Sequence, residues 1–257
     1  MPRTTLLVAL AALALAPAGV RAEDTASEPA PATSTATGGG ALSSGWLLNG
    51  ATVGAGRNYL FGEIGWPGLN LSLLHGVSEK FDVGGTFSFV YGLEGMAETS
   101  RGHYFHSSAI APGFKLNAIL KLNLANKDKF NLGLRLNPGL AIYFPSAGVY
   151  YSYLYDVRYR SSTTMFGIQF PLEILVGIVP IRALSIHLGI AMPMVLFFVP
   201  DFSFIFPIQP GFGVEYKVDS SLVLTLDTRY GPSFVMAPNT THTEFSFRVQ
   251  FGLGYRF

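Results

Sequence analysis

Apolar and polar residues alternate along most of the chain from Gly45 onward. The last segment shows the pattern best: every second residue from Phe245 to Phe257 is apolar or aromatic, and the residues between are Ser, Arg, Gln or Gly. The segments 114–124 and 130–142 repeat it. A period of two places successive side chains on opposite faces of a β-strand. The pattern therefore predicts strands with one apolar and one polar face.

Ten such strands are expected, at residues 46–56, 66–76, 81–92, 109–124, 129–144, 163–178, 183–198, 204–217, 221–235 and 244–257. The connections alternate between two kinds. Short turns are expected at 77–80, 126–128, 179–182 and 218–220, and longer loops at 57–65, 93–108, 145–162, 199–203 and 236–243. Short turns opposite longer loops are typical of membrane barrels, and an even strand number brings both ends to the turn side. The predicted fold is all-β: a transmembrane, antiparallel, up-and-down barrel of about ten strands.

Two further features favour a membrane barrel over a soluble one. Several predicted strands exceed the ~9–11 residues that a tilted membrane strand needs. Aromatic residues also stand where the strands should cross the two interfaces. The expected girdle residues are Tyr91, Phe144, Phe198 and Tyr230 on the loop side, and Phe81, Phe130, Tyr216 and Tyr255 on the turn side. Within one strand, we expect Leu134 to face lipid and Gly133 to face the lumen, where Gly133→Ser should be mild.

The N-terminal residues read as a secretory signal. Arg3 precedes an apolar run, Leu6–Ala16, and Val20–Ala22 fits a signal-peptidase site, so we expect cleavage after Ala22. Residues 23–44 are rich in Ala, Pro, Thr, Ser and Gly and are expected to form a disordered periplasmic tail. Residues 45–257 should then form the single barrel domain.

Composition narrows the function classes. Charged residues make up only 13% of the chain, and the mean hydropathy is +0.36. Even so, no apolar stretch after the signal is long enough for a membrane helix, so the apolar residues are spread along the chain. Loss of Arg3 and Arg21 leaves one basic residue fewer than the 16 acidic ones, which excludes a nucleic-acid footprint. The absence of cysteine excludes disulfides, thiolate chemistry and a lipid-anchored cysteine.

The C-terminal strand carries a resemblance. Its alternating apolar residues, with Tyr255 and a terminal Phe257, resemble the end of Gram-negative outer-membrane β-barrel proteins. The resemblance implies that Phe251, Leu253, Tyr255 and Phe257 form the signal for the barrel-assembly machinery. It also implies a location in the outer membrane, in contact with lipids and lipopolysaccharide, and we expect a monomer.

The polar faces of the strands predict a charged lumen. The residues expected to point inward are Asp82, Lys115, Lys121, Arg135, Glu173, Glu215, Asp227, Arg229, Arg248 and Arg256, with Gln169 and His187 nearby. Six basic groups face four acidic ones, which would suit a narrow, weakly anion-attracting, porin-like channel. The same groups could instead form ion pairs that fill a structural barrel, since a lumen of about eight strands is already filled by side chains.

A tyrosine-rich segment offers a second function. Tyr150, Tyr151, Tyr153, Tyr155, Arg158 and Tyr159 fall within eleven residues of a predicted outer loop. Tyrosine and arginine are enriched at binding hot spots, so the loop could serve a surface adhesin or receptor. The alternative is a barrel wall that continues above the membrane with a tyrosine girdle.

A third hypothesis is a hydrolase at the outer rim, either a protease or a lipid-modifying enzyme. The candidate groups are Glu94, Glu98, His103, His106, Asp156, Asp201, His242 and Glu244. No enzyme signature surrounds them. His103 and His106 lie three residues apart but lack a third ligand for a metal. The sequence therefore favours a protein without enzymatic activity, metal or cofactor.

Overall fold

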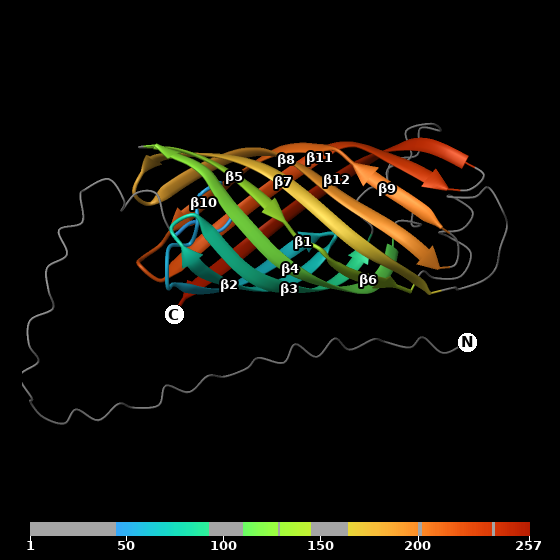
Figure 1. Ribbon diagram of the computed structural model, residues 1–257, viewed down its shortest axis with the longest axis horizontal. Helices are drawn as coiled ribbons and strands as arrows, with labels where there is room; N and C mark the ends of the chain where they lie inside the picture. The colour runs from blue at the N-terminus through green and yellow to red at the C-terminus, as the bar shows by residue number, and fades with distance from the viewer. Residues whose placement is uncertain (1–44, 93–109, 128, 145–163, 200–201, 238–239) are drawn as a thin grey trace, which may run out of the picture. The chain divides into compact units, whose positions relative to one another are not determined.

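The computed structural model describes residues 45–92, 110–127, 129–144, 164–199, 202–237 and 240–257 (Figure 1). The expected signal peptide and N-terminal tail lie outside the described residues. Among those described, no helix is long and apolar enough to cross a membrane.

Twelve strand segments form one sheet that closes on itself. They are β1 (Asn58–Trp66), β2 (Gly68–Ser78), β3 (Phe81–Gly92), β4 (Ile110–Lys127), β5 (Phe130–Leu136), β6 (Gly139–Tyr143), β7 (Met165–Ile181), β8 (Leu184–Val199), β9 (Ser203–Pro207), β10 (Gln209–Lys217), β11 (Leu222–Ala237) and β12 (Thr240–Arg256). Every pairing is antiparallel, and β1 pairs with both β2 and β12, which closes the barrel.

Two pairs of segments each count as one strand of the barrel wall. β5 and β6 both pair with β4 and β7, and β9 and β10 both pair with β8 and β11. Pro138 stands between β5 and β6, where it has no N–H to donate to the ladder. The wall therefore has ten strands, and the predicted fold class is confirmed.

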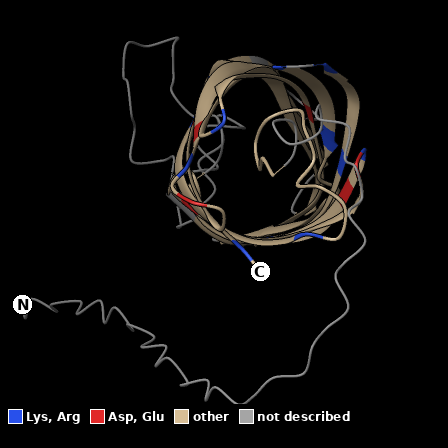
Figure 2. Ribbon diagram, turned by 90° about the vertical axis from the view of Figure 1, so that its left-hand side faces the viewer, with Lys and Arg blue, Asp and Glu red and all other residues tan. Residues whose placement is uncertain are grey.

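The first predicted strand is wrong. Residues 46–56 do not lie in the wall, and the first wall strand is β1, in a stretch that the sequence assigned to a loop. Pro67 alone connects β1 to β2, so the predicted loop 57–65 does not exist. Residues 45–56, which we call the plug, instead lie inside the barrel at the end where β2–β3, β4–β5, β7–β8 and β10–β11 are joined by short turns (Figure 2).

β1 escaped prediction because both of its faces are apolar at the turn side. Leu60 and Ile64 are exposed on the outer face, whereas Tyr59 and Phe61 point inward and are buried against Leu47 of the plug. A strand whose inner face packs on an apolar plug loses the alternation that marks a polar lumen.

The outer surface of the barrel is apolar and its interior is largely polar, the reverse of a soluble barrel. Leu116 is 63% exposed on β4, whereas Lys121, five positions further on and therefore on the opposite face, is fully buried. A closed sheet with an apolar outer face satisfies all the conditions for crossing a bilayer with strands. This is the fold of an outer-membrane β-barrel.

Most predicted girdle residues are exposed on the outer surface: Phe144, Phe198, Tyr230, Phe130, Tyr216 and Tyr255. Tyr91 and Phe81 are partly buried. The Tyr91 hydroxyl donates a hydrogen bond to the carbonyl of Gly65, and its ring packs edge-on against Trp66. The aromatic belts therefore form largely at the expected ends of the strands.

The interior changes character along the barrel. The plug occupies the turn side, and charged groups occupy the middle. The loop side carries an apolar cluster of inward residues that includes Val90, Tyr143, Met165, Phe197 and Val235. The alternation in sequence did not predict this last layer, because near the loops both faces of several strands are apolar.

Candidate functional site

The plug is buried from residue 45 to residue 54 although it contains no strand, and only Ala55 and Gly56 at its end are exposed. Trp46, Leu47 and Val53 are almost completely buried. Leu47 and Val53 pack with inward apolar residues of β1, β2, β4 and β11, whereas Trp46 packs with Val179 of β7. The ammonium group of Lys217 lies 3.7 Å from the centroid of the Trp46 ring, a cation–π contact. Apolar packing therefore holds the plug against the wall at the turn side.

Two buried charges bind the backbone of the plug. The Glu215 carboxylate accepts hydrogen bonds from the N–H groups of Leu47, Leu48 and Asn49 at 2.7, 3.0 and 2.7 Å. Lys121 Nζ donates to the carbonyls of Trp46 and Leu47, both at 3.1 Å. An irregular backbone inside a membrane barrel needs such partners, because an unpaired buried N–H or C=O is costly.

Further wall residues hold the rest of the plug. The Asp82 carboxylate accepts the N–H of Val53 at 3.0 and 3.2 Å, and Asn123 Nδ2 donates to the carbonyl of Gly50 at 2.8 Å. Asn49 Nδ2 donates to Ser185 Oγ at 2.8 Å. The contacts come from β3, β4, β8 and β10, so the plug is fastened to strands on several sides of the lumen.

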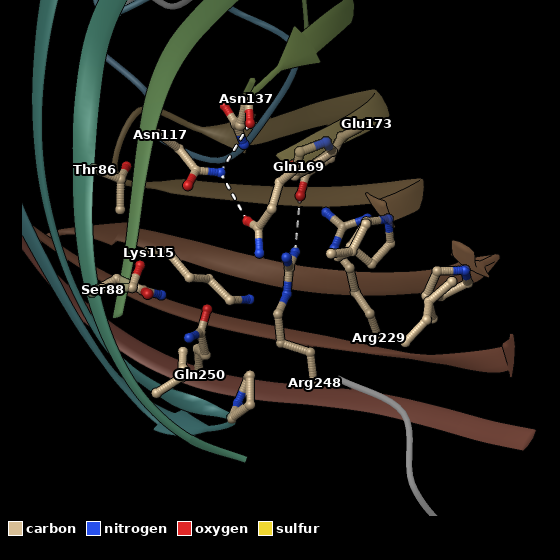
Figure 3. Close-up of a pocket in the computed structure, with 18 of the residues that line it drawn as sticks. Thr86, Ser88, Lys115, Asn117, Asn137, Gln169, Glu173, Arg229, Arg248 and Gln250 are labelled. Carbon is tan, nitrogen blue, oxygen red and sulfur yellow. Dashed lines mark hydrogen bonds and ion pairs between the residues drawn. The ribbon is translucent and has the colours of Figure 1, made fainter. Parts of the chain in front are cut away.

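A second cluster of charges spans the middle of the lumen. Asp227 accepts hydrogen bonds from His187 Nε2 at 3.0 Å, Arg229 Nε at 3.1 Å and Arg248 Nη2 at 2.9 Å. Arg248 Nη2 also donates to Glu173 at 3.1 Å (Figure 3). Together with Arg135, 3.9 Å from Glu173, these residues form an ion network that neutralises buried charge.

Inward glycines make room for the long side chains of this network. A Cβ atom on Gly213 would lie 2.3 Å from His187 Cε1, so His187 reaches Asp227 only because that position has no side chain. In the same way a Cβ on Gly211 would lie 2.7 Å from Arg229 Cγ. These glycines, which alternate with apolar residues in the sequence, therefore leave space in the lumen for the side chains of His187 and Arg229.

Between the plug and the loop-side apolar cluster lies a chamber. Leu48 of the plug contributes to its lining, as do Tyr143, Phe197 and Val235 of the apolar cluster. Water-molecule centres can occupy about 110 Å³ of it, which is room for several waters. Its charged lining residues are Glu63, Lys115, Arg135, Glu173, Asp227, Arg229, Glu244 and Arg248.

The chamber is balanced in charge, with four acidic and four basic residues in its lining. Glu63 belongs to β1, which the sequence assigned to a loop, and Glu244, expected at the outer rim, is 5% exposed inside the barrel. These two carboxylates offset the excess of two basic groups on which the expected preference for anions rested. The chamber thus offers no net charge of either sign.

The predicted lumen residues fall into several groups. Asp82, Lys121 and Glu215 hold the plug, whereas Arg135, Glu173, Asp227, Arg229 and Arg248 form the network, with His187. Lys115 and Gln169 line the chamber, and Arg256 lies half-buried beside Tyr59 at the turn side. The residues of the expected assembly signal, Phe251, Leu253, Tyr255 and Phe257, are exposed on the outer face.

Other candidates cannot be placed. The tyrosine-rich segment 150–160 lies outside the described residues, as do Glu94, Glu98, His103, His106, Asp156 and Asp201. The backbone of His242 belongs to β12, but its side chain is not described. Within the described part of the chain, no group of three or more His, Cys, Asp or Glu could hold a metal ion.

Comparisons with known proteins show a likeness among solved structures. A scan against protein-family models and a search of the curated proteins found no match. Among solved structures, the chain is similar to the outer membrane protease OmpT from Escherichia coli. That match has 9% sequence identity and a TM-score of 0.42, and covers 79% of this chain and 94% of that chain.

This likeness corrects one expectation. The sequence predicted a protein that is not an enzyme, and the matched structure, which is that of a protease, contradicts that prediction. At this identity and TM-score the comparison assigns neither an activity nor site residues to the present chain.

Proposed function

We propose that the protein is an integral barrel of the Gram-negative outer membrane whose lumen is sealed toward the periplasm by the plug. In this proposal the protein does not act as a general pore. Its accessible interior is the polar chamber between the plug and the loop-side apolar cluster.

The outer surface supports the membrane location. Apolar side chains such as Leu71, Leu116, Leu188 and Phe251 are exposed on strands around the barrel, where water would leave them unfavourably hydrated. Lipid chains and lipopolysaccharide are the natural partners of such a surface. In membrane barrels the short turns face the periplasm, so the plug would close the periplasmic end.

The single observation that carries the sealed lumen is the binding of the plug backbone by Glu215 and Lys121. A barrel of ten strands is only slightly wider than one that side chains fill completely. A chain segment fastened inside it, together with the ion network beyond, leaves little width for a continuous water path.

Conductance in planar lipid bilayers tests the proposal. The refolded full chain should give silence or a small conductance without strong ion preference. Lys121→Met removes both bonds to the plug carbonyls and should produce frequent openings, while Lys129→Met, at an exposed turn position, should behave as the wild type. Heat-modifiable migration in gels would verify that both variants fold. A large, stable conductance of the wild type would overturn the sealed lumen.

A further inference from the structure

Two side-chain amides in the chamber wall are bonded to each other in a defined orientation. Asn117 Nδ2 donates to the backbone carbonyl of Asn137 at 2.9 Å and to Gln169 Oε1 at 3.2 Å (Figure 3). Since a backbone carbonyl can only accept, the first bond determines which end of the Asn117 amide carries nitrogen. The second bond then determines the orientation of Gln169.

This arrangement leaves one acceptor and one donor without partners. Asn117 Oδ1 and Gln169 Nε2 are buried, and neither has a hydrogen-bond partner within the described structure. Gln169 is 2% exposed. A buried polar group left unpaired costs about 1–3 kcal/mol, so the two atoms favour any guest that pairs with them.

The rest of the lining indicates the chemistry of that guest. Arg229 Nη1, also buried and without a partner in the described part of the chain, adds a second donor. The hydroxyls of Thr86 and Ser88 lie in the same wall (Figure 3). Because four acidic and four basic residues balance each other in the lining, the chamber favours neither anions nor cations. A neutral guest therefore fits better than an ion.

A hydroxyl group both donates and accepts, so a solute with several hydroxyls can pair with both the acceptor and the donor that the two amides leave unpaired. At the loop-side end of the chamber, the lining includes Tyr143 and Phe197, whose rings meet edge to face with centroids 5.8 Å apart. Such apolar surface suits the C–H face of a sugar ring, whose rim carries hydroxyls. The chamber has room for several water molecules, which a small solute such as a single sugar ring would replace.

We infer that the chamber binds a small, uncharged, hydroxyl-rich solute of the sugar class, with Asn117 Oδ1 accepting from one hydroxyl and Gln169 Nε2 donating to another. The inference rests on the proposed function in one respect: because the plug closes the turn side, the solute has to enter the chamber from the loop side.

Binding of D-glucose and myo-inositol to the refolded full chain tests this inference. The protein is kept in a zwitterionic detergent without a sugar headgroup, and the solutes are added while the unfolding temperature and tryptophan fluorescence are followed. Trp66 packs against the apolar cluster beside the chamber and can report occupancy. A saturable rise in unfolding temperature is expected with at least one of the two solutes, and none with acetate or glycine.

Two matched variants locate the site. Gln169→Met removes the donor of the amide pair and should weaken binding at least tenfold. Gln209→Met makes the same change at another fully buried glutamine, which bonds to Ser246 and does not line the chamber, and should leave affinity unchanged. Absence of saturable binding by either solute, preference for acetate or glycine, or equal effects of the two variants would overturn the inference.

Conductance distinguishes this inference from the proposed function. Sugar binding by a barrel that conducts strongly would contradict the sealed lumen and leave the binding site standing. A silent barrel that binds neither solute would contradict the binding site alone.

Discussion

Gly133 of β5 faces Gly50 of the plug so closely that a Cβ atom on Gly133 would lie 2.4 Å from the Gly50 carbonyl oxygen. The sequence suggested that Gly133→Ser would be mild, because Gly133 points into a lumen. The contact indicates the opposite, since a backbone carbonyl held by Asn123 cannot easily move away.

Gly133→Ser should therefore lower the unfolding temperature and displace the plug. Gly85→Ser is the control, because a Cβ on Gly85 meets nothing closer than a backbone oxygen at 3.6 Å. Thermal unfolding of both variants by circular dichroism checks the difference. Equal unfolding temperatures would mean that the plug is not seated against β5.

Glu215→Ala should release the plug from the wall. The substitution leaves three buried N–H groups without their acceptor, and each costs about 1–3 kcal/mol when unpaired. The chain has no cysteine, so Val53→Cys provides a single thiol inside the plug. That thiol should be inert toward maleimide in an otherwise natural barrel and should react once Glu215→Ala is added.

Val77→Cys, at an exposed position near the turn side, supplies the positive control for labelling. If the thiol at position 53 reacts equally fast with and without Glu215→Ala, the carboxylate does not hold the plug.

Asp227→Asn should be strongly destabilising. Asp227 is the common acceptor of His187, Arg229 and Arg248, and removal of its charge deprives both buried guanidinium groups of a carboxylate, although Arg248 keeps its bond to Glu173. Loss of one partner of a buried ion pair costs about 3–5 kcal/mol. Urea unfolding in detergent measures the free energy of unfolding. Asp219→Asn, in the exposed turn after β10, is the matched control and should have little effect; similar losses in both variants would argue against the network.

Leu134→Arg should cost about 2–4 kcal/mol, because the side chain faces the bilayer from β5. Its neighbours in sequence, Gly133 and Arg135, both point inward, which leaves Leu134 on the outer face. Unfolding from lipid vesicles measures the cost. Tolerance of arginine at this position would show that the outer face of β5 does not contact lipid.

Deletion of Phe257 should lower the yield of folded protein in the outer membrane and leave precursor in the periplasm. Phe257 is 63% exposed beyond the end of β12, and its N–H donates to the carbonyl of Asn58, next to the closing seam of the barrel. Cell fractionation with heat-modifiable gel migration measures the yield. Normal barrel levels would argue against recognition of this end by the assembly machinery.

The alternation of residues by itself determined the class of fold and most of the wall. Each wall strand from β3 to β12 coincides with a run of period two, and the outward residues Leu116 and Phe251 are exposed as that period requires. A shift by one residue would exchange every side chain between lipid and lumen, so the two chemically different surroundings leave a clear trace in the chain.

Only the tertiary structure decided what the lumen contains. A pattern along one strand reports that Asp82, Lys121 and Glu215 point inward, but not what they meet there. Their partners are backbone groups of the plug, which closure of the barrel brings against them from a distant part of the chain. The plug itself resembles a strand in sequence because burial inside the barrel selects apolar residues as effectively as lipid does outside it.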